Sequence, residues 1–184
     1  PEKFAPRAKI VHFDVDHSSV SKIIEADIAV FGQVKNSLKQ INNKLKSESA
    51  IFSDDKYADW HKQIDVWRQE HGLDHDMYKN LDDSLPVLPQ AAVQQIYQSS
   101  GGKAFVTSDV GQHQMFAAQY YHFDEPRKWI NSGGLGTMGF GLPSAMGVKL
   151  AYPDEEVICI TGEGSIQMCI QELSTCSQYK LPIK

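Results

Sequence analysis

The chain has 184 residues, of which 41% are hydrophobic, and its formal net charge is −5. This length accommodates one or two domains with an apolar core. The excess of acid gives no support for nucleic-acid binding, and no apolar run approaches the ~18–20 residues of a membrane helix. Because the chain begins with Pro1, has no apolar leader and soon reaches a strand-like segment, we expect an internal piece of a longer protein.

The excess of negative charge is local. The stretch from Asp54 to Asp83 contains nine acidic and four basic residues, which accounts for the whole imbalance. We interpret it as the solvated face of a connector. The cysteines, Cys159, Cys169 and Cys176, fit neither a disulfide framework nor a zinc site. They predict reduced, buried thiols and therefore a cytoplasmic protein.

Residues 1–46 are predicted to be the end of a parallel α/β domain. Strands are expected at Lys9–Val15 and Ile28–Phe31, which are rich in β-branched and aromatic residues. Helices are expected at His17–Ile24 and at about Val34–Leu45. This strand–helix–strand–helix order is typical of parallel sheets.

Residues 47–88 are predicted to be a charged helical connector. Four side chains recur there at helical spacing: Tyr57, Trp60, Ile64 and Trp67. They predict one amphipathic helix that ends near Gly72, followed by a loop as far as Leu88. Packing against a domain explains this aromatic stripe better than a ligand platform does.

Residues 89–184 are predicted to be the first part of a second parallel α/β domain. Strands are expected at Ala104–Thr107, Lys128–Asn131 and Val157–Thr161. Helices are expected at Pro89–Ser99, within Val110–Gln119, at Leu142–Ala151 and at Ile166–Tyr179. The last strand, VICIT, is continuously apolar, as in parallel strands buried on both faces. Leu181–Ile183 resembles the start of another strand, so we expect an open sheet edge.

Two glycine-rich turns contain the residues that indicate a ligand-binding site. The first runs from Gly133 to Gly141, where glycines let the main chain approach a ligand and a helix N-terminus favours an anion. The second, Thr161-Gly162-Glu163-Gly164-Ser165, follows a buried strand at the edge where open α/β sheets bind ligands. Its carboxylate suits Mg²⁺, and its serine suits a phosphate. Neither turn is a standard phosphate fingerprint, so the residues alone leave open a metal-bound phosphate cofactor or purely structural turns.

Three stretches, taken together and in order, resemble one family: Thr107–Ala118 (TSDVGQHQMFAA), Trp129–Gly147 (WINSGGLGTMGFGLPSAMG) and Ile160–Leu173 (ITGEGSIQMCIQEL). They are similar to the diphosphate-binding domain of thiamine-diphosphate enzymes, in particular the acetohydroxyacid (acetolactate) synthase branch. Upstream, His12–Lys22 resembles the end of this family's FAD-carrying middle domain. The resemblance implies an α/β fold: the end of a parallel α/β middle domain, then the first half of a three-layer parallel α/β domain that binds thiamine diphosphate.

The resemblance also implies binding roles for the residues that match its motifs. Thiamine diphosphate would be bound by Gly111, Gln112, His113, Gly136, Met138, Gly164 and Ser165. Gly136 would present its carbonyl to the aminopyrimidine, Met138 would be the apolar wedge that bends the cofactor, and the others would lie along the diphosphate. Mg²⁺ would be bound by Glu163, where the family usually has Asp. FAD would lie near Asp14, Val15, Gln33 and Val34, and the family often has Asp at position 33.

The implied activity is a transferase reaction in branched-chain amino acid biosynthesis, in which pyruvate is decarboxylated and joined to a second 2-ketoacid. The implied partners are a second copy, as a homodimer or tetramer, and a small regulatory subunit, without nucleic acid or membrane. The family's second metal ligand and its acid/base glutamate do not occur in this sequence, so we expect the chain alone to be inactive. The alternatives are another enzyme with this cofactor (pyruvate oxidase, glyoxylate carboligase or a 2-ketoacid decarboxylase) and a non-catalytic nucleotide-binding or interaction module.

Overall fold

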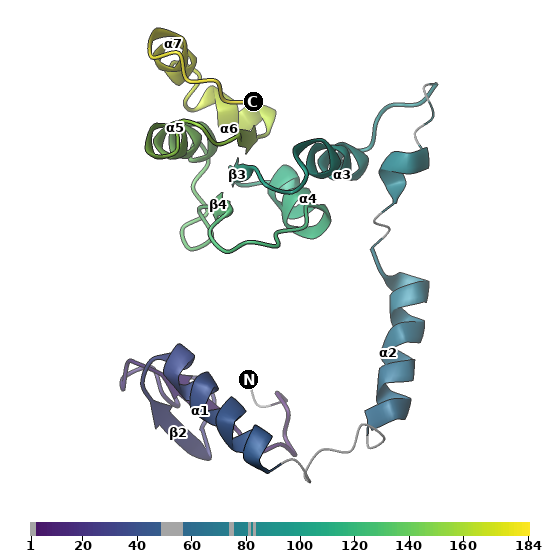
Figure 1. Ribbon diagram of the computed structural model, residues 1–184, viewed down its shortest axis with the longest axis vertical. Helices are drawn as coiled ribbons and strands as arrows, with labels where there is room; N and C mark the ends of the chain where they lie inside the picture. Colours follow the sequence, from purple (N-terminus) through teal and green to yellow (C-terminus); the bar gives the residue numbers. More distant parts are fainter. Residues whose placement is uncertain (1–2, 49–56, 74–75, 81, 83) are drawn as a thin grey trace. The chain divides into compact units, whose positions relative to one another are not determined.

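The computed structural model describes residues 3–48, 57–73, 76–80, 82 and 84–184 (Figure 1). The chain divides into two compact units, unit 1 (Pro1–Val66) and unit 2 (Trp67–Lys184), and the division falls within helix α2 (Ala58–His71). The sequence-based division at residues 46/47 and 88/89 stays a prediction. None of the described helices has the length and apolar character needed to cross a membrane.

Unit 1 contains a two-stranded parallel sheet, one complete helix and the first part of α2. Strand β1 (Val11–Asp14) pairs with β2 (Ile28–Phe31) in a register that places Val11 opposite Ile28. Helix α1 (Val34–Ser47) follows. Both strands and this helix lie where the sequence predicts them. None of the described residues of unit 1 is buried.

The helix predicted at His17–Ile24 is wrong, because this segment forms turns and bends. The carboxylate of Asp16 accepts hydrogen bonds from the N–H and hydroxyl of Ser18 and from the hydroxyl of Ser19. Such local side-chain bonds compete with helical hydrogen bonding. Ser21 has a φ of +59°, which no α-helix contains.

Unit 2 is built on a three-stranded parallel sheet in the order β4-β3-β5. The strands are β3 (Phe105–Ser108), β4 (Trp129–Asn131) and β5 (Val157–Ile160). Successive side chains of the central strand β3 point to opposite faces. Val106 joins a core with residues of helices α3 (Pro89–Ser100) and α4 (Gln112–Tyr120) and the residue that follows α4, whereas Phe105 joins a core with helix α5 (Gly141–Ala151).

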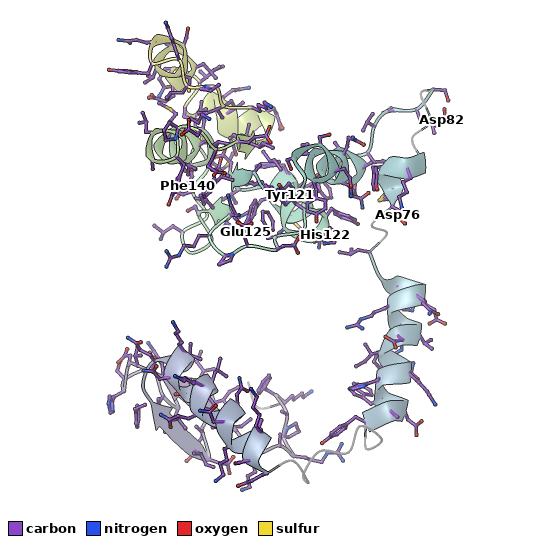
Figure 2. All side chains as sticks on the ribbon, in the orientation of Figure 1. Asp76, Asp82, Tyr121, His122, Glu125 and Phe140 are labelled. Carbon is purple, nitrogen blue, oxygen red and sulfur yellow. The ribbon has the colours of Figure 1, made fainter. Side chains whose placement is uncertain are left out.

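These two cores place helices on both faces of the sheet. Figure 1 shows α3 and α4 on one side of β3 and α5 on the other. The predicted α/β class, parallel strands with flanking helices, is therefore confirmed. Tyr121 and His122, labelled in Figure 2, extend from the end of α4 to the ring of Tyr97 in α3, at 5.2 Å between centroids in each case.

Two sequence predictions in unit 2 differ from the structure. The predicted loop before α3 contains a 3₁₀ turn, η2 (Met77–Asn80), which packs on α3 because the N–H of Tyr78 donates to the buried Gln94. The helix predicted at Ile166–Tyr179 is two helices, α6 (Glu163–Gln167) and α7 (Glu172–Gln178). Tight i→i+3 bonds between them, such as Cys169 N–H to the Ile166 carbonyl at 3.1 Å, interrupt the α-helix.

The edge of β5 that does not face β3 forms backbone hydrogen bonds with the last described residue, Lys184. The N–H of Cys159 donates to the carbonyl of Lys184 at 2.7 Å, and the N–H of Lys184 donates to Val157 at 3.1 Å. Residues 181–184 are not a regular strand, but these bonds follow the ladder that a strand at this position would make. This agrees with the strand start predicted at Leu181–Ile183.

Candidate functional site

A cavity of about 540 Å³ lies at the carboxyl end of β3 and β5. Its walls come from the segment after β3, the glycine-rich loop before α5, the turn after β5 and the start of α3. The lining residues are Pro89, Val110, Gly111, Gln112, His113, Phe116, Met138, Thr161, Gly162, Glu163, Gly164 and Ser165. This is the position at which open parallel sheets bind ligands, because the connections diverge from the strand ends there.

The imidazole of His113 lies between two glycines from different segments. A Cβ on Gly111 would stand 2.8 Å from its Cε1, and a Cβ on Gly162 would stand 2.7 Å from its Nδ1. Atoms that close clash, so the ring fits only because both positions lack a side chain. Gly111 also has a φ of +155°, which favours glycine. The two glycines therefore let α4 and the turn after β5 approach each other.

His113 has an unused hydrogen-bonding atom at the cavity. Its Nε2 is buried and has no partner among the described residues. Burial lowers the pKa of His113, against the opposing effect of the charges of Asp109 and Glu163, so the imidazole is neutral near pH 7. A neutral imidazole has one N–H donor and one acceptor, and buried polar atoms in native proteins normally have partners. His113 is thus suited to a polar ligand in this cavity.

The two glycine-rich segments meet at the cavity. A Cβ on Gly164 would lie 3.4 Å from Cε of Met138, which is ordinary van der Waals contact. Ser165 is 1% exposed, and its hydroxyl reaches the carbonyl of Val110 only at 3.4 Å. Such a long hydrogen bond is weak, so the hydroxyl can turn to another acceptor. The cavity therefore has both an apolar side chain, Met138, and a polar one, Ser165, in its lining.

Glu163 is the carboxylate among the lining residues. No group of three or more His, Cys, Asp or Glu that could hold a metal occurs in the part of the chain that the structure describes. Mg²⁺ does not require one, because it is commonly bound by one or two carboxylates, water and the phosphates of a ligand. The donor set fits Mg²⁺ that arrives with a diphosphate better than a metal bound by protein alone.

The structure brings most of the predicted cofactor residues together. Gly111, Gln112, His113, Met138, Glu163, Gly164 and Ser165 all line the cavity. Gly136 does not line it, although a Cβ at this position would lie 3.9 Å from Val110, which does. The individual roles of these residues stay predictions.

The four residues predicted near FAD lie in unit 1, at the carboxyl ends of its strands. Asp14 ends β1 opposite Phe31, and the N–H of Gly32 donates to the Asp14 carbonyl at 3.0 Å. Val15 and Val34 are 64% and 58% exposed, and Gln33 is the residue before α1. The structure places the four around one sheet edge without enclosing them.

Sequence reasoning missed five residues of the site. Pro89, Val110, Phe116 and Thr161 line the cavity, and Asp109 lies buried directly behind it. Thr161 and Asp109 lie inside the motif stretches quoted in the sequence analysis. Each is a polar residue directly after a buried strand, and this pattern could have indicated them. Pro89 had no such signal, because it comes from a helix remote in sequence.

Comparisons with known proteins agree with this geometry. Residues 109–184 match the family described as thiamine pyrophosphate enzyme, C-terminal TPP binding domain. The matched segment contains every lining residue of the cavity except Pro89. Residues 109–184 are therefore similar to the C-terminal domain that binds thiamine pyrophosphate in these enzymes.

The chain is also similar, along nearly its whole length, to acetolactate synthase large subunits. It is 52% identical over 181 residues to the large subunit of acetolactate synthase isozyme 3 of Escherichia coli, covering 98% of this chain and 31% of that protein. It is 47% identical to the large subunit of Haemophilus influenzae over 99% of this chain and 31% of that protein. It is 40% identical to the chloroplastic acetolactate synthase of Arabidopsis thaliana over 100% of this chain and 26% of that protein. The chain thus spans between 26% and 31% of the length of these relatives.

Proposed function

We propose that this chain is part of an acetolactate synthase large subunit, in which it forms one side of the site for thiamine diphosphate and Mg²⁺. The single cavity shared by the glycine-rich loop with Met138 and the turn with Glu163 carries the proposal. The similarity to acetolactate synthases, which extends over both units, supports this reaction over those of other enzymes with the same cofactor.

The bound cofactor would supply the chemistry that removes carbon dioxide from a 2-ketoacid. The residues of this chain would bind and orient it. Glu163 would bind Mg²⁺ together with diphosphate oxygens, and Ser165 would donate its hydroxyl to the diphosphate. His113, neutral in this environment, would donate or accept one hydrogen bond through Nε2. Met138 would pack against the cofactor and exclude water from that wall.

We also propose the wider setting that the resemblance implies. The substrates would be pyruvate and a second 2-ketoacid, in branched-chain amino acid biosynthesis. The protein would be a cytoplasmic flavoprotein that binds FAD near Asp14, Val15, Gln33 and Val34, and it would form a homodimer or tetramer with a small regulatory subunit. The three cysteines, all free thiols, are compatible with a reducing compartment.

Product analysis of the full-length protein tests the reaction. With pyruvate, thiamine diphosphate, Mg²⁺ and FAD, we expect acetolactate. Acetate or acetaldehyde as the main product would instead indicate an oxidase or a decarboxylase. A polypeptide of these 184 residues alone should not turn pyruvate over, because the acid/base glutamate implied by the family is not among them.

Calorimetric titration separates the enzyme from a non-catalytic binding module. Thiamine diphosphate and MgCl₂ are titrated into the 184-residue polypeptide and into the full-length protein. We expect much weaker binding to the former, since it supplies only one side of the site. Equal affinities in the two, without turnover in the full-length protein, would favour a binding module.

A further inference from the structure

Asp109 is completely buried directly after β3, although it does not line the cavity. Burying a carboxylate is costly unless hydrogen bonds compensate it. Its Oδ1 accepts the backbone N–H of Gly141 at 2.7 Å, and its Oδ2 accepts the hydroxyl of Thr161 at 2.6 Å. Both bonds are short, as hydrogen bonds to carboxylates are. Asp109 therefore connects three segments that are remote from one another in sequence.

The bond to Gly141 completes the start of α5. The first N–H groups of a helix have no partner within the helix, and Phe140, the preceding residue labelled in Figure 2, provides no side-chain cap. The carboxylate of Asp109 supplies the partner from the neighbouring strand. A Cβ at position 141 would lie 2.6 Å from Oδ2 of Asp109, so this approach requires glycine.

Each of the three connected segments carries one wall of the cavity. His113 follows Asp109 by four residues, Met138 precedes Gly141 by three, and Glu163 follows Thr161 by two. Each of these three side chains contributes to one wall. A side chain this close in sequence to a residue bonded to Asp109 moves together with that residue. The position of Asp109 therefore controls how far these walls stand apart.

Two other side-chain bonds support the same region, but neither joins all three segments. The hydroxyl of Thr107 donates to the Gly141 carbonyl at 3.0 Å, which connects β3 with α5. The hydroxyl of Ser165 reaches the Val110 carbonyl at 3.4 Å, which connects the segment after β3 with α6. Neither holds the loop before α5 and the turn after β5 to one common group.

We propose that Asp109 is a positioning residue for the site described under the proposed function, on which this inference rests. It fixes the separation between the loop with Met138 and the turn with Glu163, and so prearranges the site for Mg²⁺ and a diphosphate without touching either. Without Asp109 the ligand itself must restore that separation, which weakens its binding. Once the cofactor is bound at saturation the geometry is restored, so turnover falls less than affinity.

The test uses the full-length protein with Asp109→Ala, which removes both hydrogen bonds, and with Thr161→Val. Each variant is titrated with thiamine diphosphate at constant MgCl₂ and with MgCl₂ at constant thiamine diphosphate. Both variants should raise the dissociation constants about 10- to 100-fold, the range for residues that orient metal ligands. Their effects should be less than additive in the double variant, because each removes the same connection. Thr161→Ser retains the hydroxyl and should recover most of the affinity lost in Thr161→Val.

A matched control is Lys149→Met at the other end of α5. The Lys149 ammonium is buried and donates to the Glu155 carbonyl at 2.6 Å, so its loss should lower the urea midpoint of the apoprotein and leave both dissociation constants unchanged. If the variants at positions 109 and 161 behave like Lys149→Met, Asp109 is purely structural and the inference is wrong. If the unmodified protein does not bind thiamine diphosphate, the proposed function itself fails and this inference fails with it.

Discussion

Both units contain a parallel sheet with predicted binding residues at the carboxyl ends of its strands. They differ in what surrounds those strand ends. In unit 2 the central strand β3 is wholly buried, helices cover both faces, and the strand ends open into a cavity. In unit 1 two strands, helix α1 and the first part of α2 leave none of the described residues buried. A carboxyl edge therefore becomes a defined cavity only where packing holds the connections that leave it.

Polar groups show the same difference. In unit 2, Asp109 is 0% exposed and has two short hydrogen bonds to other segments. In unit 1, Asp14 is partly exposed and its carboxylate accepts the N–H of Asp16, two residues away, at 2.9 Å. Hydrogen bonds in water-exposed places add little net stability, whereas breaking a buried one leaves an unsatisfied group. We expect large effects from changes at the edge of unit 2 and small ones at the edge of unit 1.

The largest effect is expected from Glu163→Gln in the full-length protein. The amide keeps the shape of the side chain but removes the charge that would bind Mg²⁺, so the affinity for Mg²⁺ in the presence of thiamine diphosphate should fall by at least about 100-fold. Magnesium-dependent activity and calorimetry measure it. Glu163→Asp, with the residue usual in this family, should retain binding.

Asp154→Asn is the control for Glu163→Gln. It makes the same change of charge at an exposed position before the amino end of β5, and the affinity for Mg²⁺ should not change. Equal losses in the two variants would mean that the overall charge, rather than a metal ligand, determines the affinity.

Gly162→Ala should lower the free energy of unfolding by about 1–3 kcal/mol, as overpacking does. Its φ of −104° suits any residue, so the cost comes only from the contact with the His113 ring. Combining it with His113→Ala should remove most of that cost, since the ring is then absent. Urea unfolding of the apoprotein measures each variant.

Gly147→Ala is the matched control for Gly162→Ala, because a Cβ there meets nothing within 4 Å. Alanine in the interior of α5 should leave stability unchanged or raise it slightly. Additive losses in the double variant of positions 162 and 113 would contradict the packing of the imidazole between the two glycines.

Asp14→Ala should weaken FAD binding only roughly three- to tenfold, the equivalent of one exposed hydrogen bond. Fluorescence of bound FAD in the full-length protein measures it. Asp27→Asn, at the opposite end of the sheet where the carboxylate accepts from Lys9, should have no effect. A loss above about 100-fold at Asp14 would mean that the edge of unit 1 is enclosed as tightly as that of unit 2.

The smallest effect is a dependence of stability on pH. Burial lowers the pKa of His113 below its usual 6.5, so on acidification the unfolded chain takes up a proton before the folded one does. Stability should therefore fall as the pH decreases from about 6.5 through the lowered value. Unfolding midpoints between about pH 5 and 7 should vary less in His113→Asn. An unchanged slope would show that the imidazole is not buried in solution.

Local patterns predicted the elements of unit 2 closely, and the reason is visible in the residues. The apolar run VICIT, the proline at the start of Pro89–Ser100 and the helical periodicities are signals within a few neighbours. The wrong helix predictions, at His17–Ile24 and Ile166–Tyr179, lie where a local side-chain hydrogen bond or a tertiary contact determined the backbone conformation. Asp16 with Ser18 replaced a helix by turns, and Cys169, 5% exposed, lies where α6 and α7 separate.

By itself, the sequence determined the α/β class and the parallel strands, because spacing and residue type encode them. The residues that gather at the carboxyl ends of the strands were indicated by the resemblance of their motifs to a known family. Only the tertiary structure decided how those residues meet. Asp109 and Thr161 are 52 residues apart and 2.6 Å distant in space, and the ring of His113 fits between Gly111 and Gly162 only because the two strands lie side by side. Contacts of this range depend on how the strands pair and pack, which no local pattern records.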